Sequence, residues 1–213
     1  MVKNRELGRK IGKRKARKFI LIVVEGKETE INYFNSLKQY LKLVTLSIEV
    51  VSSKYSDPLS VVNHALFLKQ QRQNLSNNTL KLPYDEIYCV FDGDHPNRQN
   101  YRDAIAQANK HNLSVIASIP CFEIWFLLHF QYSTQIFHNC DEVGRKLKTY
   151  IPHYEKSLNV FPIISIQTKT AIINSEKLFQ YHDDLTTQDF PNPSTDAHQL
   201  VKKLFEEKDN KKR

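Results

Sequence analysis

Continuous apolar runs alternate with helix-periodic segments through the first 120 residues of the chain. Short runs rich in Ile and Val are typical of strands that are buried on both faces of a parallel sheet. The pattern predicts strands at 18–24, 46–51, 84–91 and 113–119, with helices beginning near residues 29, 58 and 98. An order of strand and helix that repeats in this way predicts a parallel sheet of about four strands with helices on both faces.

Local sequence signals set several of the expected boundaries. Thr29 is predicted to cap the first helix, and Pro58 to open a second helix that runs to about residue 73. The polar, Asn-rich stretch 71–82 predicts a loop after that helix. Further along, Ser194 or Thr195 is predicted to cap a helix over 196–207.

The chain changes character after the fourth predicted strand. Residues 121–130 are almost entirely apolar and predict a helix buried against the sheet, followed by helices at 141–147 and 170–181. We therefore expect three parts: a basic flexible arm at 1–18, an α/β core at 19–130, and a helical extension at 131–213 packed on that core.

The positive charge is concentrated at the beginning of the chain. The net charge is +8, and residues 1–18 hold nine of the 31 Lys and Arg but one of the 23 acids, so the remaining chain has 22 of each and is neutral. A basic arm attached to a neutral body suits a polyanion such as DNA or RNA, although a solvated arm without a specific partner fits equally well. The predicted nucleic-acid contacts are Arg9, Lys10, Lys13, Arg14, Lys15, Arg17 and Lys18.

Composition excludes several classes of protein. Five glycines argue against Gly-rich phosphate loops, and no apolar run is long enough to span a bilayer, so no membrane partner is expected. Cys89, Cys121 and Cys140 have spacings that fit neither a zinc motif nor a disulfide framework, and we interpret them as buried or incidental thiols. These features indicate a reducing, cytoplasmic setting.

Acids follow directly after two of the predicted buried strands. Glu25 ends the first apolar run, and Asp92, Gly93 and Asp94 end the third. Alternation along an extended chain places Asp92 and Asp94 on one face, and the carboxyl ends of parallel strands are where such sheets bind ligands. A hard divalent cation such as Mg²⁺ or Mn²⁺ is bound by few carboxylates and keeps several waters. Turn capping by the aspartates is the alternative interpretation.

Neighbouring residues have both supporting and structural interpretations. Glu30 is a further possible metal ligand, or a simple complement to the helix dipole. Lys27 is either a phosphate contact or a solvated lysine. Glu123 stands among apolar residues and must be paired, neutral or metal-bound if it is buried. His95 is a supporting residue for proton transfer or a turn histidine.

Four segments together resemble the RloB family. They are ILIVVEGKETEINYF, YCVFDGDH, IPCFEIWFLLHF and NPSTDAHQLVKKL, and they span residues 20–204. The resemblance implies a Toprim-like α/β three-layer sandwich, a nuclease activity linked to abortive infection and antiviral defence in bacteria, and association with a partner ATPase. It assigns the catalytic and metal-binding acids to Glu25, Asp92 and Asp94. It also assigns Glu30 to the metal, although the spacing from Glu25 to Glu30 matches the family pattern less closely. The resemblance makes Glu123 a stronger candidate for a supporting site residue.

The sequence therefore predicts a Mg²⁺- or Mn²⁺-dependent nuclease acting on DNA or RNA. A regulatory or nucleic-acid-binding subunit of an ATPase-containing defence complex, inactive alone, is the main alternative, and nucleotidyl transfer at the same metal centre is a third. The pattern does not distinguish DNA from RNA, and it leaves the oligomeric state open.

Overall fold

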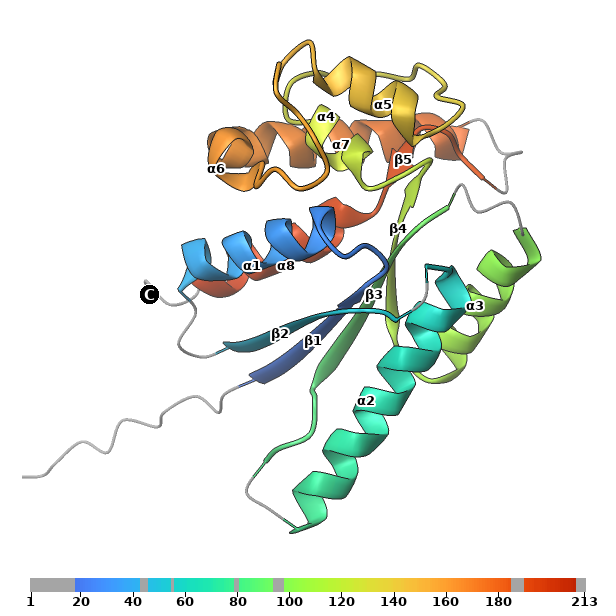
Figure 1. Ribbon diagram of the computed structural model, residues 1–213, viewed down its shortest axis with the longest axis vertical. Coiled ribbons are helices and arrows are strands. Elements are labelled where there is room, and N and C mark those ends of the chain that lie inside the picture. Colours follow the sequence, from blue (N-terminus) through green and yellow to red (C-terminus); the bar gives the residue numbers. More distant parts are fainter. Residues whose placement is uncertain are drawn as a thin grey trace, which may run out of the picture.

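The computed structural model of the protein describes residues 18–42, 46–54, 56–78, 81–93, 98–184 and 190–209. Figure 1 shows the arrangement of the helices and strands. The strands are β1 (Lys18–Val24), β2 (Leu46–Ser52), β3 (Glu86–Asp92), β4 (Ser114–Ile119) and β5 (Ser194–Thr195). The α-helices are α1 (Thr29–Leu41), α2 (Pro58–Asn78), α3 (Arg98–Lys110), α4 (Glu123–Leu127), α5 (Cys140–Leu147), α6 (Phe161–Ile164), α7 (Thr168–Asp184) and α8 (Ala197–Asp209), with a 3₁₀ turn, η1 (Ser165–Gln167), between α6 and α7.

The strands form one sheet in the order β2-β1-β3-β4-β5. The four longer strands are parallel, and the two-residue β5 pairs antiparallel with β4. Because β1 and β3 are neighbours and parallel, their carboxyl ends lie at the same edge of the sheet. The expectation of an α/β fold with a mainly parallel sheet is confirmed.

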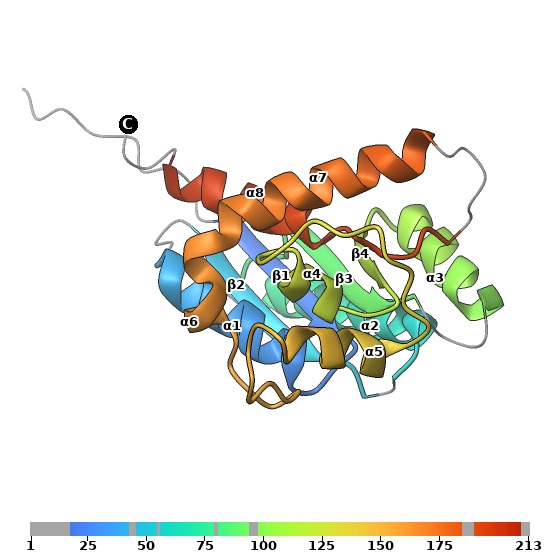
Figure 2. The ribbon, with the colours of Figure 1, turned by 90° about the horizontal axis from the view of Figure 1, so that it is seen from above.

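Alternate residues of the central strands point into two different cores. Ile20 and Ile22 of β1 belong to a core shared with α1, α4, α7 and α8, whereas Leu21 and Val23 pack with α2 and α3. The helices thus cover both faces of the sheet (Figures 1 and 2). A strand between two such layers has no solvent-facing side, which explains why β1 is apolar at successive positions.

The C-terminal helical region packs on the same side of the sheet as α1. Side chains of α4, α5, α6, α7 and α8 join the core cluster that includes Tyr33 and Phe34 of α1, and Trp125 of α4 is fully buried there. Figure 2 shows α7 crossing above α8. In the described part of the chain, no helix is both long enough and apolar enough to cross a membrane.

Helix α2 is longer than the sequence pattern predicted. The polar stretch expected as a loop from residue 71 continues the helix to Asn78. Arg72 explains part of this extension, because its guanidinium lies 5.2 Å from the ring centre of Phe19 and 4.9 Å from that of Tyr84, and its Nε donates to the carbonyl of Leu82 at 2.7 Å. Tertiary contacts therefore hold a helical segment that propensity alone does not favour.

One expected helix cap is displaced, whereas Thr195 caps the start of the last helix as predicted. Thr29 is the first residue of α1, and the N-cap is Glu28, which makes no side-chain capping bond. The Thr29 hydroxyl instead donates to the carbonyl of Lys156 at 3.2 Å. Near the C-terminus, Ser194 and Thr195 form β5, and the Thr195 hydroxyl accepts the Ala197 N–H at the start of α8. A two-residue strand has no periodicity by which a sequence could reveal it.

Candidate metal and phosphodiester site

A cleft of about 480 Å³ lies at the carboxyl edge of β1 and β3. Most of its lining comes from the β1–α1 segment, with single residues from β3, the β2–α2 loop, α4 and the loop after α5. The lining residues are Glu25, Gly26, Lys27, Glu28, Thr29, Glu30, Ser56, Asp92, Glu123 and Lys156. Five carboxylates thus face one space with two lysines, and such an imbalance favours a bound cation.

Glu25 and Asp92 are fixed to the ends of the two strands by backbone hydrogen bonds. The N–H of Glu25 donates to the Val90 carbonyl at 2.9 Å, and its Oε2 accepts the Asp92 N–H at 3.0 Å. Asp92 Oδ1 in turn accepts the N–H of Phe122 at 2.9 Å. The two predicted site acids are therefore brought side by side, as the parallel topology implied.

The environment of Asp92 disfavours its charge. Desolvation of the carboxyl raises its pKa well above the ordinary value, and the negative charges of Glu30, Glu123, Cys140 and Glu25 raise it further. A bound cation would reverse this effect, because it stabilises the ionised form.

Glu30 reaches back from the first turn of α1 over Gly26. A Cβ atom added to Gly26 would lie 2.0 Å from Glu30 Oε2, so the absence of a side chain at Gly26 is what admits this carboxylate. Glu30 is only 5% exposed, and burial, together with the charges of Glu123 and Glu25, raises its pKa to about 7. The residue is thus a buried acid in the cleft and not merely a surface complement to the helix dipole.

Glu123 enters the same cleft from α4. It is 4% exposed, and its Oε1 accepts a 2.9 Å hydrogen bond from the hydroxyl of Tyr154. Burial raises the pKa of Tyr154, and the charge of Glu123 raises it further, so the phenol stays protonated and remains a donor. The sequence expectation that a buried acid here must have a partner is met by this bond.

Two lysines stand at the rim of the cleft. Burial lowers the pKa of Lys156, but the negative charges of Glu123, Cys140, Cys121 and Asp92 outweigh it and raise the value overall. The carbonyl of Lys156 is bonded to Thr29, and that of Ser157 accepts from Asn32 at 3.1 Å, so this loop is held against α1. Lys27, a predicted supporting residue, is exposed and also lines the cleft.

Several predicted residues cannot be placed. Asp94 and His95 lie outside the described residues, as do Arg9, Lys10, Lys13, Arg14, Lys15 and Arg17 of the basic arm. Lys18 is described and opens β1, where its Nζ lies 3.3 Å from Glu207 Oε1 and 3.7 Å from Glu86 Oε1. Its charge is therefore engaged by neighbouring acids of the folded body.

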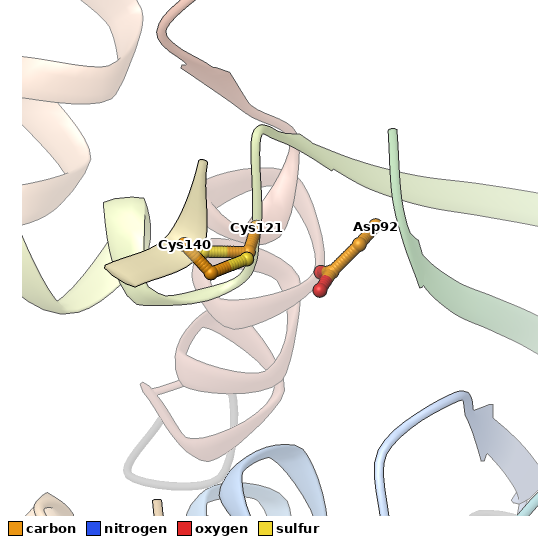
Figure 3. Close-up of side chains that lie close together, drawn as sticks. All are labelled: Asp92, Cys121 and Cys140. Atoms are coloured by element: carbon orange, nitrogen blue, oxygen red, sulfur yellow. The ribbon is translucent and has the colours of Figure 1, made fainter. Parts of the chain in front are cut away.

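Two cysteines lie beside Asp92, a proximity that their sequence spacing did not indicate. Figure 3 shows the carboxylate of Asp92 directed toward Cys121 and Cys140. Within the described ranges this is the one group of three metal-ligating side chains whose ligand atoms all lie within 4.8 Å of one another, and Glu25 and Glu30 do not form so tight a group with Asp92. Cysteines 19 residues apart fit no short motif, and they meet only because α4 packs against α5.

Comparison with known proteins identifies a family. Neither the curated proteins nor the solved structures gave a significant match to this chain. The sequence model of one family, described as RloB-like protein, matches residues 20–204, which include β1 from Ile20 onward, strands β2 to β5 and every cleft residue named above. The chain therefore belongs to the RloB-like protein family.

Proposed function

We propose that this RloB-like protein is a nuclease that hydrolyses phosphodiester bonds of DNA or RNA with Mg²⁺ or Mn²⁺ as its cofactor. The observation that carries the proposal is the convergence of Glu25, Glu30, Asp92 and Glu123 on one cleft at the carboxyl edge of parallel strands. These acids raise one another's pKa, and a bound cation would stabilise their ionised forms.

The donor set fits a hard divalent ion. Carboxylate oxygens are the ligands that Mg²⁺ prefers, and because Mg²⁺ keeps several of its waters it needs few direct protein ligands. Glu25, Glu30 and Asp92 do not form a group in which all ligand atoms lie within 4.8 Å of one another, and this looser arrangement suits a hydrated ion better than a fully dehydrated one. Asp94 is a further proposed ligand from the sequence.

Each residue has a proposed task. When bound, the metal ion supplies a Lewis acid for the scissile phosphate and lowers the pKa of an attacking water. Asp92, Glu25 and Glu30 hold the ion, and Glu25 is proposed to exchange a proton with the attacking water. Lys156 and Lys27 bind phosphate oxygens at the rim. Glu123 acts through its bond to Tyr154, which keeps the loop after α5 against the cleft.

The family resemblance extends the proposal to bacterial antiviral defence and abortive infection, with a partner ATPase in the same system. The basic arm at residues 1–17 would raise affinity for nucleic acid through phosphate contacts that do not depend on base sequence.

Asp92→Asn tests the proposal with little structural disturbance. An amide oxygen at this position still accepts the Phe122 N–H, while the charge needed for metal binding is lost. We expect Mn²⁺-dependent cleavage of plasmid DNA, linear DNA or total RNA to fall at least ~100-fold, since even outer-shell substitutions weaken metal sites 10–100-fold.

Asp103→Asn is the matched control for this substitution. Asp103 is an exposed acid of α3 whose Oδ1 accepts from Gln99, away from the cleft, and its loss is expected to leave cleavage unchanged. Equal cleavage by the wild type and by a folded Asp92→Asn protein would contradict the proposal.

A binding subunit that is inactive alone is the second candidate. Several large apolar side chains of η1 and α7 are exposed, among them Ile166 at 87%, and a contiguous patch of such side chains would mark an interaction surface. This candidate predicts that the isolated protein cleaves none of the three nucleic acids with Mn²⁺, and that cleavage or nucleic-acid binding appears only with the ATPase.

A further inference from the structure

Three segments that are distant in sequence deliver two thiols and a carboxylate to one point. Asp92 is the last residue of β3, Cys121 precedes α4, and Cys140 is the first residue of α5. Their ligand atoms, one carboxylate oxygen and two sulfurs, all lie within 4.8 Å of one another (Figure 3). The proposed nuclease chemistry uses Asp92 and makes no use of either thiol.

Packing and hydrogen bonding hold this group together. Asp92 Oδ1 accepts the N–H of Phe122, the residue after Cys121, so the chain before α4 is fastened to the end of β3. Helix α5 begins at an Asn139 cap whose side chain accepts the Glu142 N–H at 3.0 Å, and α5 packs against α4. Cys121 is fully buried and Cys140 is half-buried.

The donor types select a particular class of ion. Thiolates are soft ligands that bind Zn²⁺ and related ions and are rare around Mg²⁺. With zinc–sulfur bonds of about 2.3 Å and zinc–oxygen bonds of about 2.0 Å, a tetrahedral site needs ligand atoms ~3.5–3.8 Å apart. Because the ligand atoms here lie within 4.8 Å of one another, each pair needs to approach by about 1.3 Å at most. Asp92 can supply Oδ2, because the bond from Phe122 uses Oδ1.

The charge balance of such a site is also favourable. Two thiolates and one carboxylate around a divalent ion leave one net negative charge. Lys156 lies close enough to interact electrostatically with Cys121, Cys140 and Asp92, and its positive charge neutralises that excess. A disulfide between the cysteines would involve neither Asp92 nor Lys156. A metal ion would be bound by Asp92, Cys121 and Cys140, and the charge of Lys156 would balance the site.

We propose that Asp92, Cys121 and Cys140 form a binding site for a thiophilic divalent ion of the Zn²⁺ class, with its fourth position open to water or substrate. The site has a consequence that rests on the proposed nuclease function: because Asp92 serves both ions, Zn²⁺ at the thiols removes a ligand from the Mg²⁺ centre and inhibits cleavage.

Cobalt substitution tests the site without reference to catalysis. Co²⁺ is titrated into the reduced full-length protein, and the thiolate-to-cobalt charge-transfer absorption is followed, with Zn²⁺ then added in competition. The expected result is a saturable band at one ion per chain that Zn²⁺ abolishes. Cys121→Ser and Cys140→Ser should each weaken Co²⁺ binding at least ~100-fold, since loss of a direct ligand exceeds the 10–100-fold cost of an outer-shell change.

Cys89→Ser is the matched control. Cys89 is buried in the other core, between the sheet and α2 and α3, and its substitution is expected to leave the cobalt band intact. Thermal melts of each variant without metal show whether it is folded. Absence of the band in the folded wild type, or its persistence in a Cys121→Ser/Cys140→Ser protein, would overturn the proposed site.

The inhibitory role has its own readout. Zn²⁺ is expected to suppress Mn²⁺-dependent cleavage in the wild type and to lose potency in a Cys140→Ser protein, whose carboxylates are unchanged. Equal inhibition of both proteins would overturn the inhibitory role. A cobalt band in a protein that cleaves nothing would leave the thiol site standing while contradicting the nuclease proposal.

Discussion

Glu30 shows how one buried carboxyl couples the cleft to pH. Its side chain fits over Gly26, and its pKa of about 7 lies above the ordinary 4.5 because burial and neighbouring charges disfavour ionisation. In the unfolded chain the same group ionises near its ordinary value. At acidic pH the carboxyl is protonated in both the folded and the unfolded chain, so its burial carries no charge penalty. At higher pH it ionises more readily in the unfolded chain than in the folded protein, and this difference lowers the free energy of unfolding.

The metal-free protein should consequently lose stability as pH rises. The contribution of Glu30 to stability is fully present below pH 4.5 and is lost as pH rises through about 7. Between pH 5 and pH 8 the free energy of unfolding should fall by on the order of 2 kcal/mol. Urea unfolding at both pH values with a chelator present measures it. Glu30→Gln should flatten the dependence, because the amide stays neutral.

Glu28→Gln provides the comparison for this measurement. Glu28 is two residues earlier and exposed, so its neutralisation should leave the pH dependence of unfolding as in the wild type. The same pH dependence in the wild type and in Glu30→Gln would contradict the assignment.

The hydrogen bond between Tyr154 and Glu123 joins the loop after α5 to α4. Both groups are buried, so removing the hydroxyl leaves a carboxylate oxygen without its donor. Tyr154→Phe is expected to lower the free energy of unfolding by about 1–3 kcal/mol. Chemical denaturation measures the change.

Tyr150→Phe is the matched substitution in the same region. The Tyr150 hydroxyl donates to Gln131 at 2.7 Å on the exposed surface, where water replaces the lost partner, so a cost below about 0.5 kcal/mol is expected. If Tyr154→Phe proves no more destabilising than Tyr150→Phe, the buried bond does not hold the loop as described.

The elements that the sequence predicted well are those whose pattern reflects burial directly. The bounds of β1 and the start of α3 agree with the strand predicted at 18–24 and the helix predicted to begin near residue 98. The end of α2 depends instead on Arg72 stacking on Phe19 and Tyr84, residues distant in sequence. Strand β5 depends on its pairing with β4, so neither feature has a local signature.

The same distinction applies to the cleft. Glu25 and Asp92 were predictable as neighbours because parallel strands place their carboxyl ends at one edge. The approach of Cys121 and Cys140 was not, because it depends on how α4 and α5 pack rather than on any spacing. Glu30 was predicted on its sequence position, and Gly26 supplies the physical reason that its carboxylate enters the cleft.

Charge divides the whole molecule into a nearly neutral body and a basic beginning. Residues 1–17 precede β1 and contain eight Lys or Arg and one acid. Deleting them is expected to leave the fold intact, since β1 begins at Lys18, and to weaken nucleic-acid binding. Each lost phosphate contact should reduce the slope of log affinity against log salt concentration by about 0.7–0.9.

Fluorescence anisotropy with labelled DNA and RNA at several salt concentrations measures this slope. Removal of residues 210–213, which contain three Lys or Arg at the other end, controls for a general loss of positive charge. An unchanged slope after deletion of residues 1–17 would show that the arm does not contact phosphate.

Calorimetric titration of Mn²⁺ into the full-length protein tests the central claim most directly, because metal binding at the cleft precedes any cleavage. The account predicts saturable binding in the wild type and in the Cys121→Ser/Cys140→Ser protein, and its loss in folded Asp92→Asn and Glu25→Gln proteins. Binding heats that are the same in Asp92→Asn, Glu25→Gln and the wild type would contradict the account.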